Sequence, residues 1–176
     1  MLAKTRKNEM LPIKDVFQTI IPTPIGDLLA EATHYGLFGL SFFDNKREII
    51  QQENDCLKET KNQLDEYFAG SRINFTIPLI LDGSDFQKKV WNILLKINYG
   101  ITISYKEEAI QISKPKAYRA VANANGKNPI SIIIPCHRVI ASDGAIGGYS
   151  GEVWRKKFLL NLESHLGKTK ISKKRT

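Results

Sequence analysis

Hydrophobic residues in the first half of the chain occur in short runs separated by polar and turn-forming residues. This pattern predicts β-strands over residues 16–21, 28–32 and 37–43, because each run is apolar and bounded by turn signals. Between residues 54 and 69 the apolar positions recur at near-helical spacing, which predicts a helix. Residues 73–81 are again strand-like. The first half is therefore predicted to be an α+β unit.

The second half of the chain carries mainly helical spacing. A helix capped by a serine or an aspartate is predicted over residues 84–97, and a capping-box pattern predicts a short helix over 105–112. Pro115 suits the first position of a third helix, over 115–125, and a last helix is predicted over 152–165. The two short helices joined by a tight turn suggest a helix-turn-helix.

The net charge of +8 is unevenly distributed along the chain. Residues 1–83 carry nine Lys or Arg and twelve Asp or Glu, whereas residues 84–166 carry twelve and six, and residues 167–176 add five basic residues. With the turn at Asp82-Gly83, this change predicts an α+β domain over 1–83, a basic domain over 84–166 and a basic tail over 167–176. A basic domain suggests a polyanion partner, although a solvated basic surface has the same composition.

Composition narrows the class of protein. No apolar run in the 176 residues approaches the length that spans a membrane, and the first residues lack a signal-peptide pattern. Two cysteines are too few for a disulfide framework or a cysteine-based zinc site. We therefore expect an intracellular, cytoplasmic protein.

The helix predicted over residues 115–125 has two contrasting sides. Small side chains lie on one side, at Ala117, Ala120, Val121 and Ala124. Polar and basic side chains lie on the other, at Lys116, Arg119, Asn123 and Lys127. The polar side could contact phosphates or enter a groove of a nucleic acid, and an ordinary amphipathic helix is an equally good interpretation.

The reactive groups gather after an apolar run, residues 132–134, which predicts a short buried strand ending at the bend of Pro135. Cys136 follows, and His137 could take its proton directly or through a water, while Arg138 adds positive charge that favours the thiolate. A lone Cys-His pair is more often a buried structural cysteine beside surface charges. The residues around the pair therefore have to decide between a reactive and a structural cysteine.

Three further features flank this pair. Asn128 could hydrogen-bond the turn around the cysteine, or be a plain turn asparagine. The glycine-rich segment 147–151 could bring backbone N–H groups near a ligand, and it lacks the pattern of a phosphate loop. Glu163, near the end of the last helix, would by itself be interpreted as a surface charge.

Together these residues resemble the O6-alkylguanine-DNA alkyltransferases, the methylated-DNA–protein-cysteine methyltransferases. The hallmark of that family is Pro135-Cys136-His137-Arg138-Val139. Other matching segments are Phe86-Gln87, Val90-Trp91, Tyr99-Gly100, Ser104-Tyr105, Arg119-Ala120-Val121, Asn125 to Pro129, Gly148 to Gly151, Leu159-Leu160 and Glu163. The resemblance is strong over 84–165 and weaker over 23–26 and 64–70. Three positions depart from the family pattern: Asn98 replaces a proline, and Ala122 and Glu152 replace glycines.

The resemblance implies a ribonuclease-H-like α/β domain followed by a winged helix-turn-helix-like domain. It also implies irreversible, single-use transfer of an alkyl group from guanine O6, with O4-alkylthymine as a second candidate substrate, and no cofactor or metal. Cys136 would be the nucleophile and His137 its base through a water, with Glu163 orienting the histidine. Asn128 would brace the turn, and Tyr105 would donate to the guanine ring.

Further roles in DNA binding follow from the resemblance. The substrate base would be swung out of the duplex, with Arg119 filling the gap in the stack. Val139, Tyr149 and Ser150 would line the base pocket, and the helix that carries Lys116, Ala120 and Asn123 would bind phosphates of double-stranded DNA. A helix-turn-helix usually reads the major groove, but this family uses the minor groove, which suits small side chains. A monomer that does not bind membranes is expected.

Two alternatives belong to other classes of protein. A non-catalytic relative would bind alkylated DNA and flag it for another repair pathway, but such relatives lack the reactive cysteine. A Cys-His hydrolase would turn over many times, and a helix-turn-helix regulator would bind specific sequences without Cys136.

Overall fold

Three strands and one helix form the N-terminal part of the computed structural model, which describes residues 16–43 and 48–172, with side chains up to Ser164. Strands β1 (Phe17–Ile21), β2 (Leu28–Thr33) and β3 (Gly36–Phe42) form an antiparallel sheet in the order β1-β2-β3. Helix α1 (Asp55–Phe68) contacts all three strands. The predicted strands and helix are confirmed.

The turn between β1 and β2 depends on a glycine. Gly26 has a φ of +106°, and its N–H donates to Thr23 O at 3.1 Å. A Cβ at this position would lie 3.1 Å from Arg155 Nη2. Arg155 Nε in turn donates to Ile25 O at 2.8 Å, so the turn is joined to the last helix of the chain.

The prediction of a strand over residues 73–81 is wrong. Leu79 makes one isolated parallel bridge to Leu37, and the segment is otherwise irregular. Two hydrogen bonds form the bridge, from Leu37 N to Pro78 O and from Ile80 N to Leu37 O, both at 2.8 Å. Pro78 has no N–H to extend the ladder, which limits the pairing to this point.

Four helices form the C-terminal part. They are α2 (Asp85–Leu94), α3 (Tyr105–Gln111), α4 (Tyr118–Gly126) and α5 (Val153–Ser172). Ser84 and Ser104 each complete a capping box with the residue three positions later, as the sequence predicts for Ser104. Helix α2 ends earlier than predicted, because Lys96 N and Ile97 N donate three residues back in a tightened last turn. Helix α5 extends beyond the predicted end at residue 165.

The helix-turn-helix is present, but Pro115 does not begin its second helix. Ala117 N donates to Lys114 O at 2.8 Å, which closes a turn around Pro115. The first helical bond runs from Val121 N to Ala117 O, so α4 begins at Tyr118. The proline therefore shapes the turn between α3 and α4.

The short strand predicted over residues 132–134 is also wrong. Ile130 makes a single parallel bridge to Leu40, and the chain then turns, with Ile134 N donating back to Ile130 O at 3.0 Å. Ile132 has a φ of +70°, which is unusual for a β-branched residue. All three isoleucines over 132–134 are buried. Their side chains thus belong to the core although their backbone joins no sheet.

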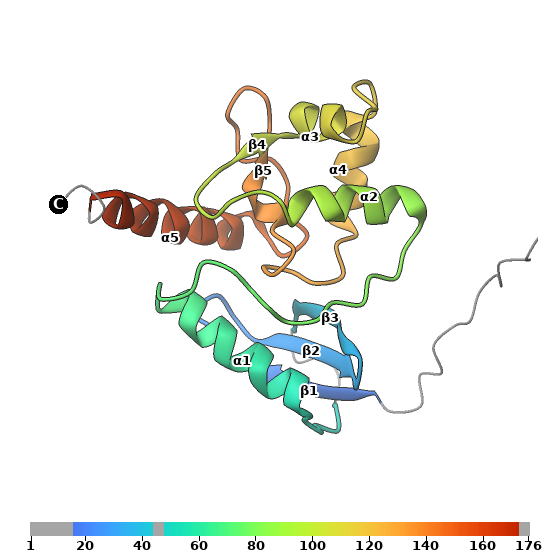
Figure 1. The fold of residues 1–176 in the computed structure, drawn as a ribbon, viewed down its shortest axis with the longest axis vertical. Coiled ribbons are helices and arrows are strands. Elements are labelled where there is room, and N and C mark those ends of the chain that lie inside the picture. Colours follow the sequence, from blue (N-terminus) through green and yellow to red (C-terminus); the bar gives the residue numbers. More distant parts are fainter. Residues whose placement is uncertain (1–15, 44–47, 173–176) are drawn as a thin grey trace, which may run out of the picture.

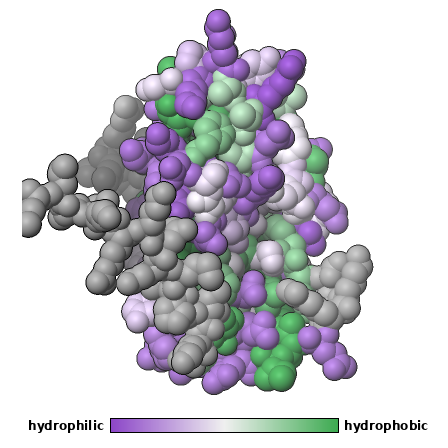
Figure 2. All heavy atoms as spheres, turned by 90° about the vertical axis from the view of Figure 1, so that its right-hand side faces the viewer, coloured by the Kyte–Doolittle hydropathy of each residue, from purple (hydrophilic) through white to green (hydrophobic). Residues whose placement is uncertain are grey.

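The two parts pack into one molecule, with the β1–β3 sheet and α1 in one lobe and α2–α4 in the other, and α5 extends from between them (Figure 1). One cluster of buried apolar residues includes members of both lobes, such as Leu40, Tyr67 and Trp91. The face drawn in Figure 2 is largely hydrophilic over its upper part, where the second lobe lies. None of the helices in the described ranges is long and apolar enough to cross a membrane.

Candidate active site

Cys136 opens a single turn of 3₁₀-helix, η1 (Cys136–Arg138), directly after Pro135. Strand β5 (Val139–Ile140) follows at once and pairs in parallel with β4 (Ile103–Ser104). The Cys136 side chain is only 5% exposed, yet it lines a cavity of about 410 Å³. A cavity of this volume is in the range of small-molecule pockets. The thiol is therefore shielded from bulk water but borders a space that a ligand group can enter.

Asn128 holds the turn around the cysteine. Its Nδ2 donates to Ile134 O at 2.8 Å and to Cys136 Sγ at 3.2 Å, and its Oδ1 accepts from Ile130 N at 3.0 Å. The amide thus fixes the backbone on both sides of the bend and supplies a donor to the sulfur. This contact agrees with the bracing role that we predict for Asn128.

The charge that faces the sulfur comes from Lys156. Burial raises the pKa of the Cys136 thiol, and the hydrogen bond from Asn128 and the positive charge of Lys156 oppose that rise. Lys156 is fully buried, and its Nζ donates to Val139 O at 2.6 Å and to Gly148 O at 3.4 Å. Burial lowers the pKa of Lys156 to about 8. The lysine therefore links the two segments beside the cavity and carries a charge that favours a thiolate.

Arg138 does not serve the thiol as the sequence suggests. Its Nη1 donates to Ile97 O at 2.6 Å, and its Nε and Nη2 donate to Glu163. The side chain is buried with 6% exposed, and the Glu163 carboxylate supplies its counter-charge. The prediction that Arg138 favours the thiolate is therefore wrong, because its guanidinium pairs with the Glu163 carboxylate.

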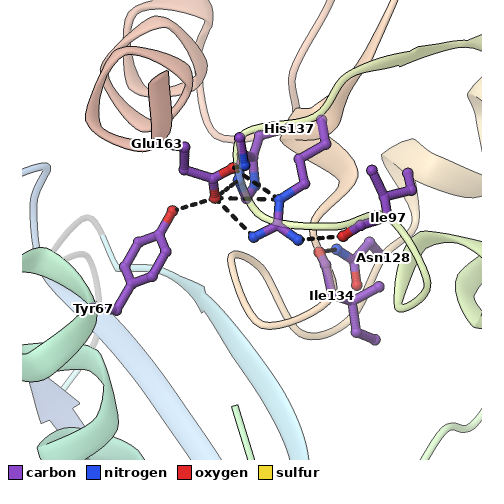
Figure 3. Close-up of polar contacts among 8 residues, drawn as sticks. Tyr67, Ile97, Asn128, Ile134, His137 and Glu163 are labelled. Carbon is purple, nitrogen blue, oxygen red and sulfur yellow. Dashed lines mark hydrogen bonds and ion pairs between the residues drawn. The ribbon is translucent and has the colours of Figure 1, made fainter. Parts of the chain in front are cut away.

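Glu163 is the centre of a buried network of hydrogen bonds (Figure 3). Four residues donate to its carboxylate: Tyr67 through Oη at 2.8 Å, Gly100 through N at 3.0 Å, His137 through Nε2 at 2.9 Å and Arg138 through Nε and Nη2. Burial by itself raises the pKa of Glu163, but the bonds from His137 and Arg138 outweigh it and hold the pKa well below its usual range. The carboxylate therefore stays ionised.

The second ring nitrogen of His137 is left without a hydrogen bond in the described part of the chain. With Nε2 bound to Glu163, Nδ1 is buried and has no hydrogen-bond partner among the described residues. Burial lowers the pKa of His137 although Glu163 opposes this, so the imidazole is neutral near pH 7 and Nδ1 is an acceptor. Glu163 thus holds an imidazole that follows Cys136 directly in the chain, and carboxylate, imidazole and thiol are the three groups that together can activate a nucleophile.

Four more of the predicted site residues line the same cavity as Cys136, namely Tyr105, Asn123, Tyr149 and Ser150. Burial, followed by the proximity of Cys136, raises the pKa of Tyr105, so the phenol keeps its proton and remains a donor. Ala122, one of the departures from the family pattern, also lines the cavity. Val139, which is predicted to line the base pocket, is not among the residues that line this cavity; its carbonyl accepts from Lys156.

The remaining predicted residues lie on or beside α4. Lys116, Arg119 and Ala120 are all exposed, so their side chains are free to meet a ligand. Only Val121 and Ala124 of the small-residue side are buried, and Trp91 Nε1 donates to Ala124 O at 2.9 Å. Ala120 thus lies on the exposed side of the helix, although its spacing groups it with Val121 and Ala124.

Sequence reasoning missed Tyr67 and Lys156. Tyr67 is fully buried, and its spacing from Leu57 and Leu64 on α1 is that of one helical face. Lys156 precedes Leu159 and Glu163 by three and seven residues, which places all three on the buried face of α5. In both cases the helical period was the available signal.

Protein-family models match both parts of the chain. Residues 16–81 match the ribonuclease-like domain of 6-O-methylguanine DNA methyltransferase, and residues 85–165 match its DNA-binding domain. A methylated-DNA–protein-cysteine methyltransferase of Methanosarcina barkeri is 44% identical over 85% of this chain and 98% of its own. The constitutive enzyme of that name from Bacillus subtilis is 42% identical over 84% and 94%.

Solved structures agree with these relatives. The crystal structure of Mycobacterium tuberculosis O6-methylguanine methyltransferase superposes with a TM-score of 0.79 at 42% identity, covering 86% of this chain and 94% of that one. The same organism's OGT in complex with DNA gives a TM-score of 0.76 at 44% identity, covering 84% and 92%. By sequence and by fold, this chain belongs to the 6-O-methylguanine DNA methyltransferase family.

Proposed function

We propose that this chain repairs DNA by direct reversal, transferring the alkyl group of an O6-alkylguanine to Cys136 in one irreversible step. The observation that carries the proposal is the buried Cys136 thiol, which borders a cavity and stands beside a His137 held by Glu163. O4-alkylthymine is a second candidate substrate. The transfer needs no cofactor, because the alkyl group moves directly from oxygen to sulfur.

The proposed chemistry gives each group one role. His137 Nδ1 takes the thiol proton through a water, and the Sγ thiolate attacks the alkyl carbon. The S–C bond forms as the C–O6 bond breaks, and its electron pair passes to the guanine. Tyr105 donates a hydrogen bond to the ring as negative charge develops there. Guanine leaves as a neutral base that has gained one proton, and this balances the proton that the thiol has lost. The thioether is stable, so each molecule acts once.

The test of this proposal is to count alkyl groups on the protein. Duplex DNA that carries radiolabelled O6-methylguanine is mixed in excess with the protein, and the label on protein is measured over time. Transfer is expected to stop near one label per molecule, on the peptide that contains Cys136, and to vanish in Cys136→Ala. The Cys56→Ala variant is the control and should transfer normally. Continued turnover, or full transfer by Cys136→Ala, would contradict the proposal.

DNA binding by the α3–α4 unit forms the second part of the proposal. Its exposed Lys116 and Arg119 suit phosphate contacts that do not depend on sequence. The small exposed Ala120 suits entry into the narrow minor groove. The Cys136 thiol is buried at the side of its cavity and cannot reach the O6 of a guanine that stays stacked in the duplex, so the nucleotide is swung into the cavity and Arg119 takes its place in the stack.

Replacing Arg119 with alanine is expected to slow transfer from duplex DNA by about 10- to 100-fold, because extrusion of a base costs a few kcal/mol that the arginine no longer offsets. Transfer from a single strand, which needs no extrusion, should change far less. Lys116→Ala is the matched control, since loss of a phosphate contact should weaken both substrates similarly. Single-turnover rates on the two substrates measure the ratio, and an equal loss on both for Arg119→Ala would contradict the role.

Several wider expectations belong to the same proposal. We expect a monomer that acts on double-stranded DNA, with a domain boundary near residue 83. We also expect a basic tail over 167–176, and the side chains of that segment lie outside the described part of the structure. The matched segments on either side of the boundary support it. Both cysteines are free, which suits a reducing, cytoplasmic location. The alternative of a non-catalytic DNA-binding relative is disfavoured by the thiol at Cys136.

A further inference from the structure

We propose that Tyr67, from the N-terminal domain, is a positioning residue for the transfer, because its hydroxyl fixes the Glu163 carboxylate that orients His137. The inference rests on the proposed function, in which His137 takes the proton of Cys136. It gives the N-terminal domain a direct part in the chemistry of a site that otherwise lies in the C-terminal domain.

The contact joins two elements that are 96 residues apart in the sequence. Tyr67 lies on α1 and is fully buried, and its Oη donates to Glu163 Oε1 at 2.8 Å. His137 Nε2 binds the same oxygen at 2.9 Å. Figure 3 shows Tyr67 reaching the carboxylate from the N-terminal lobe, while His137 meets it from η1. A single oxygen therefore connects the phenol to the imidazole.

The phenol is held in place by an aromatic cluster. The ring of Tyr67 lies 5.3 Å from Phe68, 5.4 Å from Phe75 and 6.0 Å from Tyr99, measured between centroids. Such contacts leave the ring little freedom to rotate. Burial and the neighbouring Glu163 raise the pKa of Tyr67 well above its usual range, so the hydroxyl keeps its proton and always donates.

A donor on Oε1 limits how strongly the carboxylate favours a protonated imidazole. The charged or titratable groups around the Glu163–His137 pair are Tyr67 from α1, Tyr99, Arg138 from η1 and Lys156 from α5. If the hydroxyl of Tyr67 is removed, more negative charge remains on Oε1, and the pKa of His137 rises. A larger fraction of the imidazole is then protonated near neutral pH and cannot accept the thiol proton.

The experiment compares Tyr67→Phe with Tyr99→Phe in the full-length protein. Both changes remove one hydroxyl from the same cluster, but the Tyr99 hydroxyl is buried without a hydrogen-bond partner among the described residues. Two rates are measured against pH for each protein. One is label transfer from alkylated duplex DNA, and the other is alkylation of the Cys136 peptide by iodoacetamide, followed by mass spectrometry.

In each profile the acid limb is the range in which the rate rises with pH as His137 loses its proton. For Tyr67→Phe we expect this limb to move to higher pH in both profiles. Rates should be about three- to tenfold lower than wild type near neutral pH and close to wild type at about pH 9. Tyr99→Phe should leave the limb in place. Replacing Tyr67 with 3-fluorotyrosine, which keeps the ring and is a stronger donor, should move the limb to lower pH. This replacement also serves if Tyr67→Phe fails to fold.

A loss of rate that is uniform across pH, or an unmoved limb in both replacements of Tyr67, would overturn the inference and leave Tyr67 a packing residue. Failure of the proposed function has a different signature. In that case the wild-type protein transfers no label from DNA, whereas the iodoacetamide profile still reports whether Tyr67 acts on the pair of His137 and Cys136.

Discussion

Replacing Glu163 with glutamine is expected to lower the free energy of unfolding by about 3–5 kcal/mol and to slow alkyl transfer by about a hundredfold or more. Arg138 is 6% exposed and takes its counter-charge from this carboxylate at 2.8 Å, so the neutral amide leaves a buried cation unpaired. His137 loses the acceptor that fixes its ring at the same time. Urea unfolding at pH 7 and label transfer measure the two effects.

The loss of stability in Glu163→Gln should depend on pH in a defined direction. The folded protein holds the pKa of Glu163 below that of an unfolded glutamate, about 4.3, so its contribution is fully present above that value. As pH falls below about 4 the contribution is lost, and wild type and variant should converge. Glu66→Gln is the matched control, because its carboxylate pairs with Arg72 at the surface and should contribute less than about 1 kcal/mol. Equal losses in the two variants would contradict the central role of Glu163.

Elements whose signals are local could be predicted from the sequence. The capping box at Ser104 places α3 correctly, because the serine and Glu107 satisfy each other's backbone N–H groups within four residues. The β1–β3 sheet likewise follows from short apolar runs between turns. In these elements the local signal and the tertiary contacts agree, so the local prediction holds.

Predictions failed where distant partners decide the backbone. The isoleucines over 132–134 have the composition of a strand, but the chain turns after the single bridge between Ile130 and Leu40. Glu152 shows the converse: it stands where the family pattern has glycine and keeps a φ of +73°. A backbone conformation that glycine adopts freely is thus retained by the surrounding loop.

The candidate site residues could be named from the sequence, but not all of their partners. Cys136, His137 and Arg138 are adjacent in one 3₁₀ turn, yet only Cys136 lines the cavity, while His137 and Arg138 both bind the Glu163 carboxylate. Arg138 therefore meets Glu163, and the cation near the sulfur is Lys156, from α5. These contacts depend on how α5 packs against η1, which no local pattern encodes.

The second large effect concerns Glu108, a fully buried carboxyl on α3. Asn125 Nδ2 donates to its Oε2 at 2.7 Å, while Glu108 Oε1 and Asn125 Oδ1 have no partner among the described residues. A proton on Oε1 would allow a second bond to Oδ1, in a cyclic acid–amide pair that satisfies both groups. Burial raises the pKa of Glu108 to about 7, although the bond from Asn125 opposes the rise, which agrees with a neutral carboxyl.

The free energy of unfolding of Glu108→Gln is therefore expected to rise relative to that of wild type as pH increases. Because the folded pKa lies above the unfolded value of about 4.3, the wild-type protein loses stability between about pH 4.3 and 7 as the buried group must ionise, and the loss levels off above that. Glutamine replaces the acid O–H with an N–H and has no charge to bury. The variant should match wild type near pH 4 and exceed it by about 2–3 kcal/mol near pH 8.

Unfolding free energies of Glu108→Gln and wild type between pH 4 and 9 test this prediction, and the neighbouring Glu107→Gln is the control with the opposite sign. Bonds from the Ser104 backbone and side chain lower the pKa of Glu107, so its carboxylate favours folding above the unfolded pKa and loses that effect in acid. A constant difference between Glu108→Gln and wild type at every pH would show that Glu108 does not titrate in this range. The contact between α3 and α4 would then be interpreted as an ionised Glu108 carboxylate held by Asn125 alone, in place of the acid–amide pair.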